Sequence, residues 1–188
     1  MTMKNLLILC LLSLSCACSP TIHYFNVMPF IDSHYTKVGE RLTLVIDKNI
    51  PNDHHFSDTN LQNFKVTNFR QSLRVSLYNT FEASFDEVSV GDQVSDQGWS
   101  LILHRVRPFH ELVPAGETTF HKALIRYEAS VYYDGEKIKI LDEQALSEEV
   151  AIFRSEIDDI FEDGIKQMCK QLYISVVEEH GKAAALKM

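Results

Sequence analysis

Residues 120–133 alternate between apolar and polar side chains, and this stretch constrains the fold of the chain more than any other feature. A period of two is typical of a β-strand that buries one face and exposes the other. The Asp134-Gly135 pair that follows favours a tight hairpin, because glycine adopts a positive φ without steric cost. We therefore expect an antiparallel pair, whose second strand runs from residue 137 towards residue 149.

Two other segments have the period of a helix. Within residues 67–85, apolar side chains recur at every fourth position and form one stripe: Phe69, Leu73, Leu77 and Phe81. Either Thr67 or Asn68 is suited to cap this helix. A second amphipathic helix is predicted to begin at Ser155, a favourable N-cap residue, and to end near Gly181, which is placed as a C-cap glycine.

Three further strands are predicted at residues 40–50, 87–90 and 99–107, from their β-branched and apolar content. Two amphipathic helices and one mostly antiparallel sheet of four to five strands make an α+β fold, a two-layer sandwich with both helices on one face. We expect a single domain over residues 39–181, followed by a C-terminal tail at 182–188.

Two long polar segments, 51–62 and 108–119, are expected to be exposed loops, the second because a proline ends the preceding strand. A connection of this length in a compact domain is either mobile or a contact surface. If strand 99–107 runs parallel to strand 40–50, both loops lie at the same end of the sheet and form one recognition surface. If strand 87–90 is instead the parallel one, the loops lie at opposite ends.

The candidate partner-binding residues lie in these loops or on the polar face of strand 120–133. Tyr132 is included because an aromatic side chain on a polar face can contact a partner. The candidates are His54, His55, Phe56, His110, Glu111 and Tyr132.

The first twenty residues, MTMKNLLILCLLSLSCACSP, have the pattern of an export signal. Lys4 precedes an apolar run over residues 5–14, which is about half the roughly 20 residues that a membrane-spanning helix needs. The small residues after it resemble a bacterial lipobox, in which a cysteine after a small residue is acylated and becomes the mature N-terminus. Cys18 fits this role because Ser19 and Pro20 then open a tether, and Cys16 is the alternative.

On this interpretation, residues 1–17 are a lipoprotein signal peptide and residues 18–38 are a tether. An ordinary secretory signal with incidental cysteines is the other possibility. The lipobox resemblance further implies placement in the outer membrane, because no aspartate follows either cysteine. The mature chain would then face the periplasm on its acyl chains. Cys169 would be its only free thiol, buried on the apolar face of the second helix.

Composition and motifs argue against several classes of function. The 188 residues include 18 Lys and Arg against 26 Asp and Glu, a net charge of −8, and no basic run suggests nucleic-acid binding. The eight histidines do not form the i, i+4 pair of a helical zinc site. No nucleophile motif or glycine-rich phosphate loop is present. We therefore expect no enzyme activity, no metal and no cofactor.

The order of elements resembles the small outer-membrane lipoproteins of Gram-negative bacteria. The segments that carry this resemblance are VTNFRQSLRVSLYNTF, WSLILHRV, ALIRYEASVYYDGEKI and the helix from Ser155. In layout they are similar to the lipoprotein of the lipopolysaccharide-transport translocon and to the auxiliary lipoproteins of ABC-type envelope transporters. The resemblance implies a non-enzymatic accessory or structural subunit of an envelope transport or secretion complex, with protein subunits as partners. The alternatives are a periplasmic lipid- or glycan-binding lipoprotein and an unrecognised periplasmic hydrolase.

Overall fold

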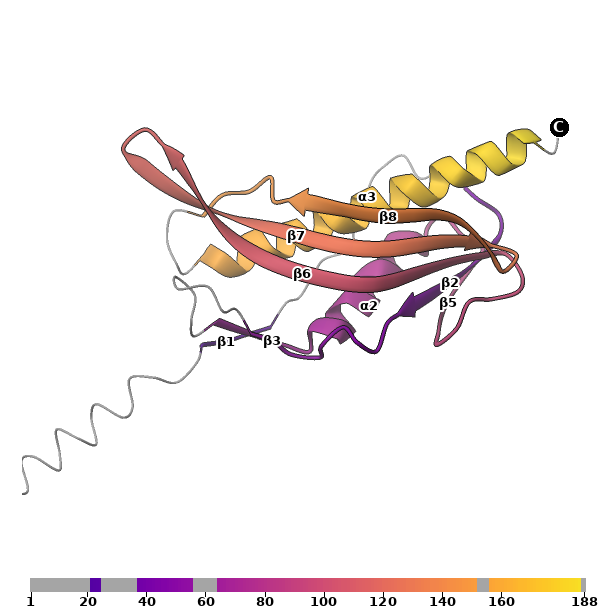
Figure 1. Ribbon diagram of the computed structural model, residues 1–188, viewed down its shortest axis with the longest axis horizontal. Coiled ribbons are helices and arrows are strands. Elements are labelled where there is room, and N and C mark those ends of the chain that lie inside the picture. The colour runs from indigo at the N-terminus through magenta and orange to yellow at the C-terminus, as the bar shows by residue number, and fades with distance from the viewer. Residues whose placement is uncertain (1–20, 25–36, 56–63, 152–155, 187–188) are drawn as a thin grey trace, which may run out of the picture.

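A five-stranded sheet forms one layer of the molecule, in a computed structural model that describes residues 21–24, 37–55, 64–151 and 156–186 (Figure 1). Its spatial order is β5-β2-β6-β7-β8. The bounds of these strands are β2 Arg41–Ile46, β5 Glu87–Gly91, β6 Trp99–Ala115, β7 Thr118–Tyr133 and β8 Glu136–Leu146. β5 and β6 both pair with β2 in parallel, whereas the longer β6–β7 and β7–β8 pairs are antiparallel.

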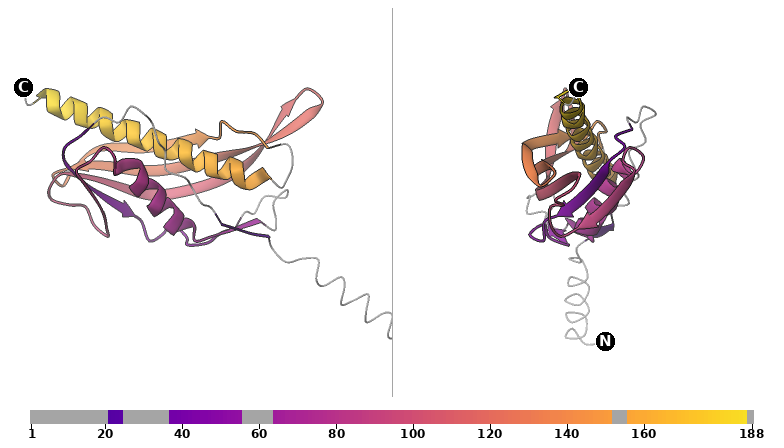
Figure 2. Two further views of the ribbon diagram at one scale, coloured as in Figure 1. Left: turned by 180° about the vertical axis from the view of Figure 1, so that it is seen from behind. Right: turned by 90° about the vertical axis from the view of Figure 1, so that its right-hand side faces the viewer.

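Two helices, α2 (Phe69–Phe81) and α3 (Ile157–Leu186), form the second layer. Figure 2 shows both on the same face of the sheet, so the predicted α+β sandwich is confirmed. α2 packs on β2 and β5, and α3 packs on β7 and β8. The predicted apolar stripe of α2 is fully buried in the core between the layers (Phe69, Leu73, Leu77 and Phe81).

The helix ends differ in part from the sequence expectation. Asn68 is the N-cap of α2, but its side chain makes no capping hydrogen bond. The amide of Phe69 instead donates to the carbonyl oxygen of Asn52 over 2.6 Å. α3 does not end at Gly181 and continues to Leu186. The residues after Gly181 are mostly good helix formers, which offset the cost of about 1 kcal/mol of one internal glycine.

A β-bulge between Leu103 and Arg105 changes which face of the sheet each β6 side chain occupies. Before the bulge, Trp99, Leu101 and Leu103 are buried against the helices; after it, alternate residues from Val106 onward are buried. The extra residue of a bulge shifts the two-residue period by one position. The bulge therefore turns the odd-numbered side chains from Arg105 onward to the sheet face that the helices leave open.

The expectation of a loop at 108–119 is wrong, because β6 continues through Pro108 to Ala115 and returns in β7. The amides of His121 and Ala123 donate away from β6, to Ala151 and Ser147. In an antiparallel pair, opposed residues whose backbone groups point away from each other do so on both strands. The residues of β6 opposite His121 and Ala123 are Leu112 and His110, so their backbone groups point to the far edge of β6, and those of Pro108 do the same. No described strand pairs with β6 along that edge beyond Leu103, so a missing N–H is tolerated at Pro108.

A smaller sheet of order β1-β4-β3 lies beside the main one, formed by β1 (Thr21–Tyr24), β4 (Phe64–Thr67) and β3 (His54–His55). β1 comes from the segment predicted as a tether and pairs in parallel with β4. β3, from the segment predicted as a loop, pairs with β4 in the antiparallel sense. Figure 1 shows this sheet at the end of the molecule where the β6–β7 hairpin projects.

Candidate functional site

The candidate site is a cleft that opens where β2 ends and β6 continues without it. Ile46 and Leu103 are the last pair between these strands. The chain after β2 then turns away, and this turn is fixed by hydrogen bonds from the amides of Asn49 and Ile50 to Asp47, over 2.8 Å to its carboxylate and 3.0 Å to its carbonyl oxygen. The two chains separate at this fork and leave a cavity of about 420 Å³ between them.

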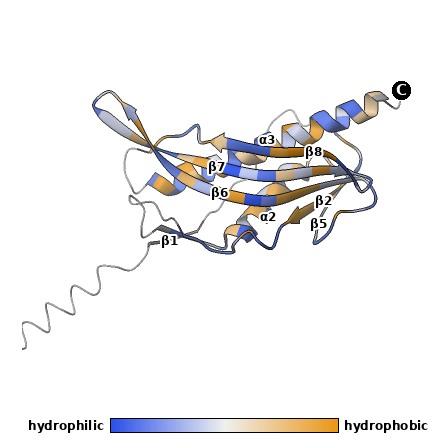
Figure 3. Cartoon of the chain, viewed as in Figure 1, coloured by the Kyte–Doolittle hydropathy of each residue, from blue (hydrophilic) through white to orange (hydrophobic). Residues whose placement is uncertain are grey.

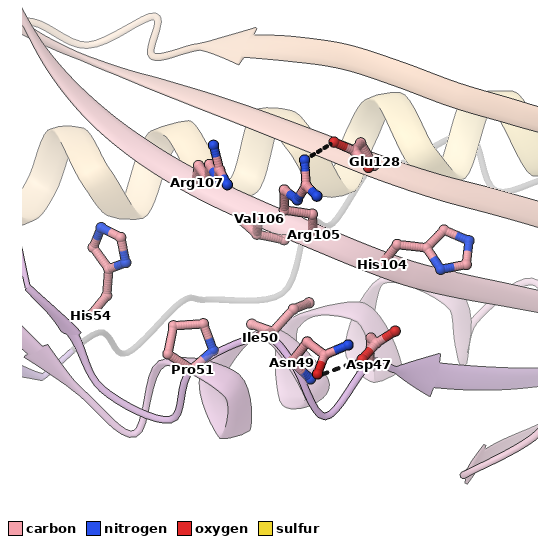
Figure 4. A pocket seen from close by; sticks show the side chains of 10 residues that line it. All are labelled: Asp47, Asn49, Ile50, Pro51, His54, His104, Arg105, Val106, Arg107 and Glu128. Atoms are coloured by element: carbon pink, nitrogen blue, oxygen red, sulfur yellow. Dashed lines mark hydrogen bonds and ion pairs between the residues drawn. The ribbon is translucent and has the colours of Figure 1, made fainter.

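Figure 4 shows the two walls of the cleft. Asp47, Asn49, Ile50, Pro51 and His54 line the wall that follows β2, and His104, Arg105, Val106, Arg107 and Glu128 line the wall formed by β6 and β7. Because β2 and β6 are parallel, segments 51–62 and 108–119 both begin at this end of the sheet, as the first alternative predicted. Residues 108–119 belong to the β6–β7 hairpin rather than to a loop, and β5 is parallel to β2 as well.

The charges of the cleft leave a cation available. The carboxylate of Glu128 accepts a hydrogen bond from Arg105 over 2.6 Å, and that of Asp47 is used within its own turn. Within the described part of the chain, no carboxylate forms an ion pair with Arg107. The cleft therefore combines two carboxylates that already accept hydrogen bonds with a guanidinium that can bind an incoming acceptor.

His54 lies at the small sheet, with its ring centroid 5.8 Å from that of Phe69. Burial and, to a smaller extent, the neighbouring His55 together lower the pKa of His54 to about 4. A histidine with this pKa is neutral at pH 7, so His54 contributes a polar but uncharged wall.

The other sequence-predicted residues lie elsewhere. His55 is exposed on β3, and Phe56 lies outside the described residues. Glu111 is exposed near the base of the β6–β7 hairpin. Tyr132 lies near the hairpin to β8, where the Lys137 ammonium group is 5.5 Å from its ring centroid. The structure thus brings His54 into the cleft and separates it from His110, Glu111 and Tyr132. The predicted acylation residues, Cys18 and its alternative Cys16, are outside the described residues.

His110 faces the helix layer rather than solvent and is only 8% exposed. Its ring stacks on that of His121 from β7, with centroids 4.8 Å apart, and Nε2 of His110 lies 2.6 Å from Nδ1 of His121. A hydrogen bond between two imidazoles requires that one donates and the other accepts. This pair links the two strands where the hairpin leaves the domain.

Arg105 and Arg107 were not singled out from the sequence. A strand ending at Pro108 gave no reason to place them beside residues 47–54, which are far away along the chain. The position of both arginines could have been predicted from the turn at Gly116, whose positive φ of 65° closes the β6–β7 hairpin. Counting outward from this turn fixes the register of both strands and places these arginines on the open face.

Within the described residues, no three or more His, Cys, Asp or Glu side chains are grouped so as to hold a metal ion. Neither of the two described helices combines the length and the apolar composition needed to cross a membrane.

The fold is similar to that of known structures. Protein XCC0632 from Xanthomonas campestris, of the family DUF330, superposes with a TM-score of 0.60 at 16% identity, over 88% of this chain and 99% of that one. This chain shares the fold of XCC0632. More distant similarities, each with a TM-score of 0.45 and 12% identity, are to a minor lipoprotein from Acinetobacter baumannii (76% of this chain, 94% of that one) and rare lipoprotein B from Shewanella oneidensis (79% and 100%). No protein-family model and no curated protein matches the sequence.

Proposed function

We propose that this protein is a non-enzymatic accessory lipoprotein of the cell envelope, which binds a protein subunit of a transport or secretion complex at the cleft between β2 and β6. The observation that carries the proposal is the fork of the sheet. It exposes Arg107 in a concave surface where Glu128 is paired with Arg105 and Asp47 accepts a backbone hydrogen bond within its own turn.

The groups in the cleft are suited to binding rather than to catalysis. A general acid or base must be free to exchange a proton near neutral pH. Glu128 is paired with Arg105, and His54 has a pKa of about 4. His104 is hydrogen-bonded to the Ser130 hydroxyl over 2.9 Å. None of the residues that line the cleft is a serine, threonine or cysteine that could act as a nucleophile.

The β6–β7 hairpin provides a second contact element. Nearly all of residues 111–119 are exposed, and Figure 1 shows the hairpin extending past the end of β8. A two-stranded ribbon has little stability of its own in water, so a partner that covers it would stabilise it. Pro108 and Pro114 interrupt the donors along its free edge and disfavour the addition of a partner strand. We therefore assign recognition to side chains of the hairpin and cleft.

The N-terminal pattern supports the membrane part of the proposal. Acylation at Cys18 would place the domain at the periplasmic side of the outer membrane. In the sequence, β1 begins only three residues after Cys18, so the small sheet and the cleft beside it would lie close to the membrane. Partner binding would then take place near the bilayer surface.

Photo-crosslinking in the native cell tests the proposal. A photoreactive amino acid at Asn49, on the exposed cleft wall, should give one discrete protein adduct. The same amino acid at Gln93, exposed in the turn after β5, is the matched control and should give none. An Arg107→Gln change should reduce the Asn49 adduct severalfold. Equal adducts at the two positions, or none at Asn49, would contradict the proposed contact surface.

A further inference from the structure

Two arginines lie directly opposite each other on the open face of the sheet, Arg107 on β6 and Arg126 on β7. Like charges at directly opposed positions destabilise a pair of strands. The chain carries a net charge of −8, so its composition does not explain this pair of cations. Such an arrangement becomes favourable when an anion binds between the two guanidinium groups.

The strand register separates these arginines from the carboxylates nearby. We use the word row for side chains that lie opposite one another on β6, β7 and β8. The row of Arg107 and Arg126 continues on β8 with Gln144, which is neutral. The row on one side contains Arg105, Glu128 and Asp142, in which Glu128 binds Arg105 at 2.6 Å. The row on the other side is entirely apolar: Phe109, Leu124 and Leu146. Figure 3 shows hydrophilic stretches among hydrophobic ones along β6, β7 and β8, as expected for strands that turn one face to solvent.

The guanidinium of Arg126 is already positioned. Its central carbon lies 4.8 Å from the ring centroid of Phe109, a cation–π contact that leaves the N–H donors at the edge of the group available. A hollow of about 110 Å³ lies at this point, lined by Arg105, Arg107, Phe109, Arg126, Tyr127, Glu128 and Asp142. This volume equals that of about three to four water molecules, which suits one small anionic group.

We propose that Arg107 and Arg126 bind one phosphate group in this hollow. A phosphate presents three oxygens and a charge between about −1 and −2, which can satisfy two guanidinium forks at once, whereas a carboxylate has two oxygens and one charge. Within the described residues Asp142 forms no ion pair, so it repels an anion from the Arg105 side and the phosphate binds towards Phe109. The apolar row beyond it can contact the rest of the ligand. This inference goes beyond the proposed function, because it does not require a protein partner.

The test measures phosphate binding by the full-length mature protein in a detergent without phosphate, by calorimetry at low ionic strength. Arg107→Gln and Arg126→Gln should each weaken binding at least tenfold. Arg41→Gln removes the same charge from the exposed start of β2, where Arg41 pairs with Glu87, and should leave phosphate binding unchanged. Equal binding by the three variants, or no binding to any phosphate probe, would overturn the proposal.

Two probes distinguish the source of the phosphate. Binding of inorganic phosphate alone indicates a site for a free anion. Binding of vesicles that contain phosphatidylglycerol in phosphatidylcholine, without binding of inorganic phosphate, indicates a lipid headgroup. In either case, Arg107→Gln should also raise the melting temperature of the ligand-free protein by a small amount, because it removes the opposed charge. A lower melting temperature together with unchanged binding would assign Arg107 a structural role only.

Discussion

The indole nitrogen of Trp99 donates a hydrogen bond over 2.7 Å to Oε2 of Glu40, and the Trp99 side chain is fully buried. His180 of α3 stands edge-on to the same indole, with ring centroids 5.9 Å apart, and its Nε2 lies 4.0 Å from the other oxygen of Glu40. Through these contacts Glu40 connects the start of β6 to the last turns of the long helix.

Glu40→Ala should lower the free energy of unfolding by about 1–3 kcal/mol, because it leaves a buried N–H donor without its acceptor. Glu40→Gln retains an acceptor oxygen and should cost less. Urea denaturation checks both, followed by the fluorescence of the single tryptophan. Glu87→Ala is the control: it removes an exposed ion pair and should change stability by less than about 1 kcal/mol. Equal losses in all three variants would contradict the role of Glu40.

Asp163 should be a second site of high sensitivity. It is buried on α3, and one of its carboxylate oxygens accepts hydrogen bonds from the amides of Glu148 and Glu149, over 2.6 and 3.0 Å. Asp163→Ala should therefore cost about 2–3 kcal/mol of stability, because two backbone donors lose a charged acceptor. Asp159→Ala, an exposed aspartate of the same helix, should cost far less in the same denaturation assay.

Much of this fold is predictable from local sequence patterns. The alternation over 120–133, the Asp134-Gly135 turn and the apolar stripe of α2 each correspond to a feature of the structure. Each of these signals is local, since it depends on the period of neighbouring side chains or on the φ that one turn requires.

The errors arise where tertiary context overrides a local signal. A proline normally ends a strand, but Pro108 occupies a position in β6 whose backbone faces an unpaired edge. A glycine near the end of an apolar stripe commonly ends a helix, but α3 continues through Gly181 to Leu186. The candidate site was found only in part, because the cleft depends on the bulge after Leu103 and on the parallel pairing of β2 with β6. Neither feature has a signal within a short window of sequence.

His54 should make stability depend on pH. Its folded pKa of about 4 lies below its ordinary value of 6.5, so the unfolded chain binds more protons between these pH values. The free energy of unfolding should therefore fall as pH is lowered from about 6.5 to about 4, by up to about 2 kcal/mol after allowance for partial solvent exposure. Above pH 6.5 this residue should have no effect.

Two histidine variants separate this contribution from that of other groups. His54→Asn should flatten the decline between pH 6.5 and 4, whereas His55→Asn, an exposed neighbour, should retain it. An NMR titration of the His54 ring measures its pKa in the folded protein directly, and we expect a midpoint near 4. A midpoint near 6.5 would show that the ring is not shielded as the structure indicates.

The thiol of Cys169 should not react with disulfide reagents in the folded protein. Its side chain is buried in the core, and burial raises the pKa of its thiol to about 12. Thiolates, rather than thiols, react with disulfide reagents. In the mature chain, labelling by such a reagent should be negligible under native conditions and complete in denaturant. Rapid native labelling would mean that α3 opens readily or that a second thiol is free.

Metabolic labelling with a palmitate analogue, followed by membrane fractionation, tests the central claim most directly, because the claimed location and partner both require the acyl anchor. We predict that the wild-type chain carries the label and fractionates with the outer membrane. Cys18→Ser should lose the label and Cys16→Ser should retain it; the opposite pattern would move the anchor to Cys16. An unlabelled wild-type chain recovered in the soluble fraction would contradict the proposal that this protein is a lipid-anchored subunit of the envelope.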